Sequence, residues 1–304
     1  MSSSLSGIGS FGVSASLLLN PVAAEIKERP VAMVANIYSL LEVKISQPEK
    51  TVFLFDLDDT AFDFPYMLGS RGWRSYIGQA AKKIDDSRNW HDVLSYFLAK
   101  NYRVETVEPI TGEFIKKLQE KGYIVCGFTS RQRELWYNTL QEGVDVTTIN
   151  QLDAVNIHFS DASLKETYPY LGLAPEYFNG TFFCDIEKGE FLTRLLKNVP
   201  ELPEKVVFVD DKRSLAESVA KALTALGISQ ESYCYLATEA KAKSFNPLIA
   251  NIQLYHFLKS KEILSDADAQ KIAEKDLSND ADFYLKASLE IANEKDSSLL
   301  EDVK

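Results

Sequence analysis

Three clusters of polar residues follow three apolar segments of this chain. The clusters lie at 56–60 (Asp-Leu-Asp-Asp-Thr), 129–131 (Thr-Ser-Arg) and 210–212 (Asp-Asp-Lys), directly after the apolar runs 51–55, 123–128 and 206–209. Apolar runs of this length without alternation are typical of strands buried on both faces of a parallel sheet. Because open α/β sheets bind ligands beyond the carboxyl ends of their strands, we expect the three clusters to converge in space.

The acidic residues of these clusters indicate a divalent cation. Clustered carboxylates repel one another, and their burial is costly unless a cation neutralises them. Mg²⁺ takes oxygen ligands and commonly combines one or two carboxylates with water and a substrate phosphate. The clusters therefore predict a Mg²⁺ site, and Mg²⁺ in turn suggests a phosphorylated ligand.

Four short motifs resemble those of the haloacid dehalogenase superfamily of phosphohydrolases. They read FDLDDT at 55–60, GFTSR at 127–131, EKGEFL at 187–192 and FVDD at 208–211, in the order found in that superfamily. Four ordered motifs are far more specific than a lone DxD. The segments TSR, KGEFL, VFVDDK and KEILSDADA also resemble a bacterial family of uncharacterised dehalogenase-like proteins. Asp59 departs from the pattern, since Gly is commoner at that position.

The resemblance implies a Mg²⁺-dependent phosphatase that hydrolyses a phosphomonoester. Asp56 is the expected nucleophile, which forms an aspartyl-phosphate. Asp58 is the expected acid that protonates the leaving group and the base that later activates water. Thr129 is expected to hold phosphoryl oxygens, and Lys188 to neutralise charge on the nucleophile and the phosphate.

The resemblance also implies the metal ligands. These are the side chains of Asp56 and Asp210 and the backbone carbonyl of Asp58, with Asp211 supporting the site. The presence of Asp58 favours a phosphohydrolase over a true dehalogenase, because displacement of halide needs no leaving-group acid.

Ser130 and Arg131 are candidate substrate-binding residues. Arg131 has two interpretations: it grips the phosphate or another acidic group of the substrate, or it forms a salt bridge at the start of the next helix. The segment 71–74, Arg-Gly-Trp-Arg, likewise either faces the site or carries Trp73 as a core anchor of a helical cap.

A long insertion separates the first two motifs. It has about 65 residues, whereas a plain βα connection needs roughly 2–6. Residues 108–121 are predicted to form the crossover helix, and 66–105 resemble a small helical cap. A cap that closes the site favours a phosphorylated small molecule, and an open site admits a phosphoprotein, for which a phosphotyrosine phosphatase is the alternative. A non-catalytic binding module with the same fold is a third alternative, although Asp56 and Asp58 are both present.

The predicted fold class is α/β, with a doubly wound parallel sheet as a haloacid-dehalogenase-like Rossmannoid core and a helical cap after the first strand. The predicted division is a leader at 1–30, a core at 31–260 that contains the cap at 66–105, and an acidic helical extension at 261–304. Helices are also predicted at 31–44 and 132–143, and a strand at 154–159.

Composition excludes several classes of protein. With 33 basic and 44 acidic residues among 304, the net charge is −11, so we expect no nucleic-acid partner. No transmembrane segment is predicted, since no apolar stretch approaches about 20 residues. Residues 1–24 carry no charged side chain. They are interpreted either as a leader of a cytoplasmic protein or as a signal for export.

Overall fold

The computed structural model describes residues 29–42, 47–133, 143–197, 199–276, 278 and 280–294. Residues 1–28 of the predicted leader, most of the helix predicted at 132–143 and the last ten residues of the predicted extension lie outside the described residues.

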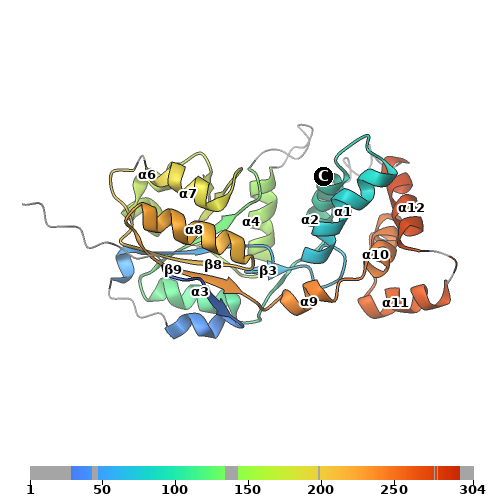
Figure 1. Cartoon of the computed structure of the whole chain (residues 1–304), viewed down its shortest axis with the longest axis horizontal. Coiled ribbons are helices and arrows are strands. Elements are labelled where there is room, and N and C mark those ends of the chain that lie inside the picture. The colour runs from blue at the N-terminus through green and yellow to red at the C-terminus, as the bar shows by residue number, and fades with distance from the viewer. Residues whose placement is uncertain are drawn as a thin grey trace, which may run out of the picture.

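A seven-stranded sheet occupies one end of the molecule (Figure 1). Its order is β1 (Ala32–Val34), β9 (Ser229–Tyr235), β8 (Lys205–Asp210), β2 (Thr51–Phe55), β5 (Ile124–Thr129), β7 (Thr181–Phe183) and β6 (Tyr177–Phe178). All neighbouring strands pair in parallel except β6 and β7. Every residue of β2 and β5 is buried. The prediction of buried strands in an α/β fold is thus confirmed, as a mostly parallel sheet. A separate antiparallel pair joins β3 (Phe62–Asp63) to β4 (Glu105–Thr106).

Helices cover the sheet on both sides (Figure 1). The side at the top of the view carries α6 (Pro169–Gly172), α7 (Lys188–Leu196) and α8 (Arg213–Ala225), and the opposite side carries α3 (Thr111–Glu120). The remaining elements near the sheet are α4 (Val144–Ala154), α5 (Asp161–Thr167) and the 3₁₀ helices η1 (Ile37–Glu42) and η2 (Pro48–Lys50). Because β2, β5 and β8 are parallel, their carboxyl ends lie at the same end of the sheet, which is called the sheet edge below.

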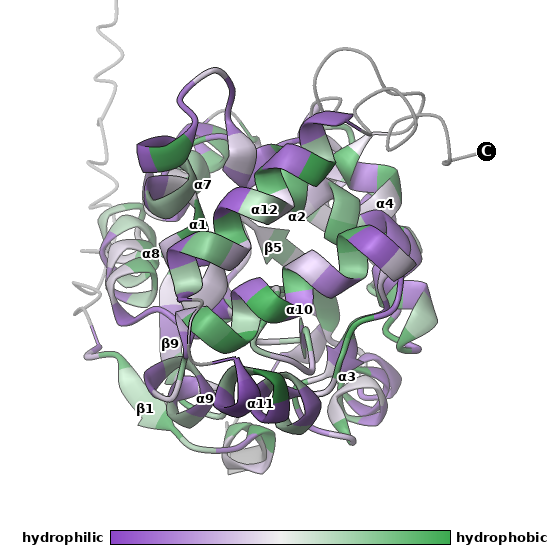
Figure 2. Cartoon of the chain, turned by 90° about the vertical axis from the view of Figure 1, so that its right-hand side faces the viewer, coloured by the Kyte–Doolittle hydropathy of each residue, from purple (hydrophilic) through white to green (hydrophobic). Residues whose placement is uncertain are grey.

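A second group of helices faces that edge. It combines α1 (Arg71–Ile84) and α2 (Trp90–Asn101) from the predicted cap with α9 (Glu239–Lys243), α10 (Pro247–Ser260), α11 (Asp266–Lys275) and α12 (Ala281–Glu294). Figure 2 shows this group on the face of the molecule turned toward the viewer. Helix α10 contacts α12 and α1, and α12 also contacts α1. Segments far apart in the sequence therefore form one helical layer over the edge of the sheet.

Two predicted elements differ in the structure. Residues 31–44 do not form one helix, since 32–34 pair with β9 as edge strand β1 before η1 begins at Ile37. The strand predicted at 154–159 is also absent: α4 runs to Ala154, and Asn156 takes a positive φ of 55°. A left-handed residue of this kind turns the chain and interrupts an extended run.

Candidate active site

The carboxyl end of β2 presents Asp56 at the middle of the sheet edge. Phe55 pairs with Val209 of β8 and with Gly127 of β5, so the three strands end nearly level. The backbone N–H of Asp56 donates to the carbonyl of Val209 at 2.9 Å. The structure therefore brings together Asp56, Thr129 and Asp210, as the sequence predicts for strands that end at a common edge.

Lys188 joins two of the acidic residues. It is the first residue of α7 and is fully buried. Its Nζ lies 2.6 Å from Oδ1 of Asp56 and 2.7 Å from Oδ2 of Asp210. Burial alone lowers the pKa of an ammonium group, but the charges of Asp210 and Asp56 outweigh it and raise the pKa of Lys188. Lys188 is therefore a fixed positive charge beside the candidate nucleophile.

Three carboxylates at this edge form a potential metal site. Oxygens of Asp56, Asp210 and Asp211 lie within 4.8 Å of one another, and all three residues are buried. Oδ2 of Asp211 makes no hydrogen bond, although Arg71 lies 3.0 Å from it as an ion-pair partner. Burial first, and then the charges of Asp56 and Asp59, raise the pKa of Asp211 to about 8. Three buried carboxylates this close together fit a hard divalent cation, which takes oxygen ligands.

Asp56, the candidate nucleophile, has a raised pKa. Burial raises the pKa of Asp56 to about 6, against the opposing effect of Lys188. The hydroxyl of Thr60 lies 3.3 Å from its second oxygen, Oδ2. Thr60 belongs to the first motif, but the sequence alone indicates no role for its hydroxyl group.

Asp58 is held by Arg131 in a bidentate pair. Nε and an Nη atom of Arg131 each donate to one oxygen of Asp58 at 2.8 Å. The other Nη atom donates to Thr148 at 3.0 Å and to Gln151 at 2.6 Å, both on α4. Burial raises the pKa of Asp58, but the charges of Arg131 and Arg74 outweigh burial and hold it well below its usual value. Of the two interpretations of Arg131, the structure shows the salt bridge, and its partner is Asp58.

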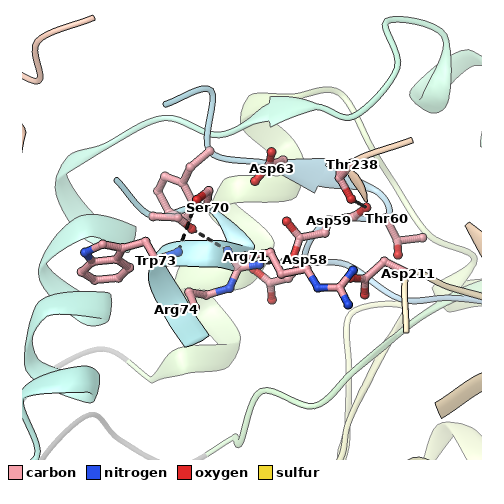
Figure 3. Close-up of polar contacts among 12 residues, drawn as sticks. Asp58, Asp59, Thr60, Asp63, Ser70, Arg71, Trp73, Arg74, Asp211 and Thr238 are labelled. Atoms are coloured by element: carbon pink, nitrogen blue, oxygen red, sulfur yellow. Dashed lines mark hydrogen bonds and ion pairs between the residues drawn. The ribbon is translucent and has the colours of Figure 1, made fainter. Parts of the chain in front are cut away.

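The acidic residues at the carboxyl ends of β2 and β8, which we call the acidic edge, are Asp56, Asp58, Asp59, Asp210 and Asp211. Two arginines of α1 reach from the helical layer to this acidic edge (Figure 3). Arg74 pairs with Asp59, and Arg71 pairs with Asp211 at 3.0 Å. Asp59 takes a positive φ of 65°, and its carbonyl accepts a hydrogen bond from Thr238 at 3.2 Å. Trp73, between the two arginines, is fully buried. Both interpretations of 71–74 hold: the arginines face the site and the tryptophan anchors the core.

A cavity of about 690 Å³ lies between the sheet edge and the helical layer. The sheet side contributes Asp56, Asp58, Thr129, Ser130, Arg131, Gln132, Asp211, Lys212 and Leu215, with Val144 from α4. The helical side contributes Trp73, Arg74, Ser75, His91, Asp92, Ser95, Leu98 and Ala99, with Phe64 and Gly69 before α1. The predicted cap residues thus share one cavity with the predicted nucleophile.

Several residues of the site could not be identified as such from the sequence. Thr148 and Gln151 bind Arg131 from α4, and Thr238 reaches Asp59 from a segment about 180 residues away along the chain. Such partners depend on how distant elements pack. An acid at 59 in place of the commoner Gly was a usable signal, because a buried extra carboxylate calls for a cation such as Arg74.

Comparisons with known proteins give relatives in one bacterial genus. A protein of Chlamydia trachomatis serovar D named "Putative outer membrane protein" is 25% identical over 260 residues, which cover 83% of this chain and 94% of that protein. A protein of the same name from Chlamydia muridarum is 24% identical over 83% of this chain and 93% of its own length. A third, from Chlamydia pneumoniae, is 25% identical over 78% and 88%.

No solved structure matches the chain. None of the helices in the described part of the chain combines the length and apolar character that a bilayer crossing requires. Residues 30–270 match a family described as "Protein of unknown function (DUF2608)", a span that contains every residue of the acidic edge. The chain belongs to this family.

Proposed function

We propose that the protein is a Mg²⁺-dependent phosphatase of the haloacid dehalogenase type that hydrolyses a phosphomonoester. The observation that carries the proposal is the arrangement around Asp56: the buried ammonium of Lys188 contacts both Asp56 and Asp210, and carboxylate oxygens of Asp56, Asp210 and Asp211 lie within 4.8 Å of one another. The family description names no activity, so the proposal rests on this geometry and on the four motifs. The sheet order, with β2 between β8 and β5, supports a doubly wound core of that type.

The residues at the edge have complementary roles in this reaction. Asp56 attacks phosphorus and forms an aspartyl-phosphate, which water then hydrolyses. Lys188 offsets negative charge on Asp56 and on the phosphoryl group, and Thr129 holds a phosphoryl oxygen. Asp56, Asp210 and Asp211 would hold Mg²⁺, which when bound would supply positive charge that favours phosphate binding.

Asp58 has two tasks that need opposite charge states. The pair with Arg131 favours the carboxylate, which suits activation of water in the second step. Donation of a proton to the leaving group in the first step requires that Arg131 release Asp58, for example by turning to the substrate. Arg131 therefore remains a candidate substrate-binding residue together with Ser130, which also lines the cavity.

The test is hydrolysis of para-nitrophenyl phosphate by the full chain, with Mg²⁺ and with EDTA, beside Asp56→Asn and the exposed control Asp185→Asn. We expect Mg²⁺-dependent turnover that Asp56→Asn lowers roughly a thousandfold or more, with circular dichroism unchanged. Near-normal activity of Asp56→Asn overturns the covalent mechanism. Absence of turnover with every phosphomonoester tried favours the non-catalytic binding module.

A small phosphorylated molecule suits the site better than a phosphoprotein. The cavity volume of about 690 Å³ falls in the usual range of ligand pockets, roughly 300–1,000 Å³. The helical layer contributes about half of its lining. Preference for a phosphotyrosine peptide over small phosphate esters of equal leaving-group acidity would reverse this assignment.

Export of the protein is also part of the proposal. The relatives' names refer to the outer membrane, and this favours export over the cytoplasmic interpretation of the uncharged residues 1–24. Fractionation of cells that express the full chain tests it.

A further inference from the structure

We propose that Lys212 binds a second anionic group of the substrate, located on the leaving group of a small phosphomonoester. This inference rests on the proposed phosphatase function and adds the class of substrate. It follows from the charges that line the cavity, from the position of Lys212 relative to Asp58, and from the start of α8.

The basic residues that line the cavity differ in whether they have an acidic partner. Arg131 is paired with Asp58, Arg74 with Asp59, and Nδ1 of His91 lies 2.9 Å from a carboxylate oxygen of Asp92. Lys212 lines the same cavity and is exposed, and it forms no ion pair with any residue that the structure describes. It is therefore the cavity cation that is available to a ligand without loss of an existing pair.

Lys212 and Asp58 line the same cavity. Asp58 is the candidate proton donor to the leaving-group oxygen, and the positive charge of Lys212 contributes to its lowered pKa. In the proposed reaction, the charge of the transferred phosphoryl group would be met by the buried Lys188 and by an ion at Asp56, Asp210 and Asp211. The backbone N–H of Lys212 donates to Asp210 at 2.8 Å, whereas its side chain is exposed in the cavity that Asp58 also lines. The ammonium group of Lys212 is thus available to the part of the substrate that departs.

The start of α8 adds to the positive field at this point. Lys212 directly precedes Arg213, the first residue of that 13-residue helix. The first turn of α8 contains no acidic residue, and no side chain caps it. Exposed N–H groups at a helix N-terminus favour anions. Leu215 in the same turn lines the cavity, so this end of the helix borders it.

The opposite wall suits a short organic leaving group. Leu98 and Ala99 of α2 offer apolar surface, while Ser75 and Ser95 offer hydroxyl groups. The leaving group that fits has a small carbon skeleton with a carboxylate or a second phosphate that reaches Lys212.

The test compares substrates that differ only in the second charge. The terminal phosphate esters of glyceric acid and of glycerol differ by one carboxylate, and a hexose bisphosphate differs from its monophosphate by one phosphate. For wild type we expect higher kcat/KM with the anionic member of at least one pair. Lys212→Gln should reduce that preference about tenfold, mainly through KM, because it removes an ionic hydrogen bond to the second anion, and a tenfold change corresponds to about 1.4 kcal/mol. Lys212→Arg should retain most of the preference, and Lys221→Gln, an exposed lysine on the same helix, should retain it all.

Each result decides the proposal. A preference that survives in Lys212→Gln, or equal losses for charged and uncharged members, overturns it, and equal losses would instead place Lys212 on the transferred phosphoryl group. If wild type hydrolyses neither these compounds nor para-nitrophenyl phosphate, the phosphatase function fails separately. Calorimetric binding of the same pairs to wild type and Lys212→Gln then still tests whether Lys212 recognises the second anion.

Discussion

Lys188 neutralises only part of the negative charge that surrounds it. Its single ammonium group lies among Asp56, Asp210 and Asp211, which together carry three negative charges when ionised. Arg71 adds a partly exposed partner for Asp211. Burial of the remaining negative charge is costly, so either protons or a bound cation must compensate for it. The acidic edge is therefore expected to respond to both pH and Mg²⁺.

Asp211→Asn should reveal this response in the protein without Mg²⁺. The pKa of Asp211 is about 8 in the folded protein, against 3.8 for the free side chain. Folding thus takes up a proton between these values, and the free energy of unfolding falls as pH rises from about 4 to about 8. Asp211→Asn removes that contribution. In EDTA, we expect its urea midpoint, relative to that of wild type, to increase from about pH 5 to about pH 8.

Mg²⁺ should reduce the difference at the high-pH end, because the ion replaces the proton on the carboxylates. Asp185→Asn, which alters an exposed carboxylate, serves as the control and should show no such trend. A difference between Asp211→Asn and wild type that is constant or shrinks with rising pH contradicts the raised pKa.

The positions of the acidic residues could be predicted from the sequence, whereas the ion-pair partners of the arginines could not. Asp56, Thr129 and Asp210 lie at strand ends, and strand ends can be located from apolar runs. The partner of Arg131 depends on where that long side chain extends from the loop, and neighbouring charges in the sequence do not determine it. The same limit applies to Arg74, whose pairing with Asp59 depends on how α1 packs over the edge.

At the scale of elements, long apolar strands and amphipathic helices were predicted and short irregular pieces were not. The strands 51–55 and 206–209 correspond to β2 and β8, and the helix 108–121 to α3. Strand β1 has three residues and is fixed by pairing with β9, which lies about 200 positions later. The apolar pattern of residues 31–44 favours a helix. It contains no information about pairing with β9, which is what makes residues 32–34 a strand.

Gly72 sets how closely α1 approaches the segment before α10. A Cβ at this position would lie 2.4 Å from the Cβ of Phe245. Gly72→Ala therefore requires a shift of α1 or of Phe245, and we expect it to lower the free energy of unfolding by about 1–3 kcal/mol. Because Arg71 and Arg74 flank Gly72, the shift should also weaken their ion pairs with Asp211 and Asp59.

Gly78 in the same helix provides the matched control. A Cβ there has its nearest neighbour at 3.6 Å, which is ordinary contact. Gly78→Ala should stabilise the protein by up to about 1 kcal/mol, since Ala favours a helix over Gly. Urea unfolding measures both variants, and effects of the same sign and size would contradict the close packing at Gly72.

At the scale of the whole molecule, one hydrophobic cluster joins the sheet to the helical layer. It contains Phe53 and Phe55 of β2, Trp73 of α1, Leu254 of α10 and Leu285 of α12. The sequence predicted that residues 261–304 form an acidic helical extension of the core. The structure shows that α12 also buries an apolar face, with Leu285 and Leu289 inside the cluster. The helical layer is therefore expected to unfold together with the sheet.

Leu285→Ala tests this cooperativity. Leu285 is fully buried, so its truncation should lower the free energy of unfolding by about 2–5 kcal/mol. Because the cluster is continuous, the loss should shift the entire urea transition, followed by far-ultraviolet circular dichroism and by tryptophan fluorescence. Phe283→Ala, two residues earlier on the same helix, removes a side chain that is 48% exposed and should change stability by no more than about 0.5 kcal/mol. Two separate transitions, of which only the first responds to Leu285→Ala, would mean that the C-terminal helices form an independent unit and that the cavity wall they support can open without unfolding the sheet.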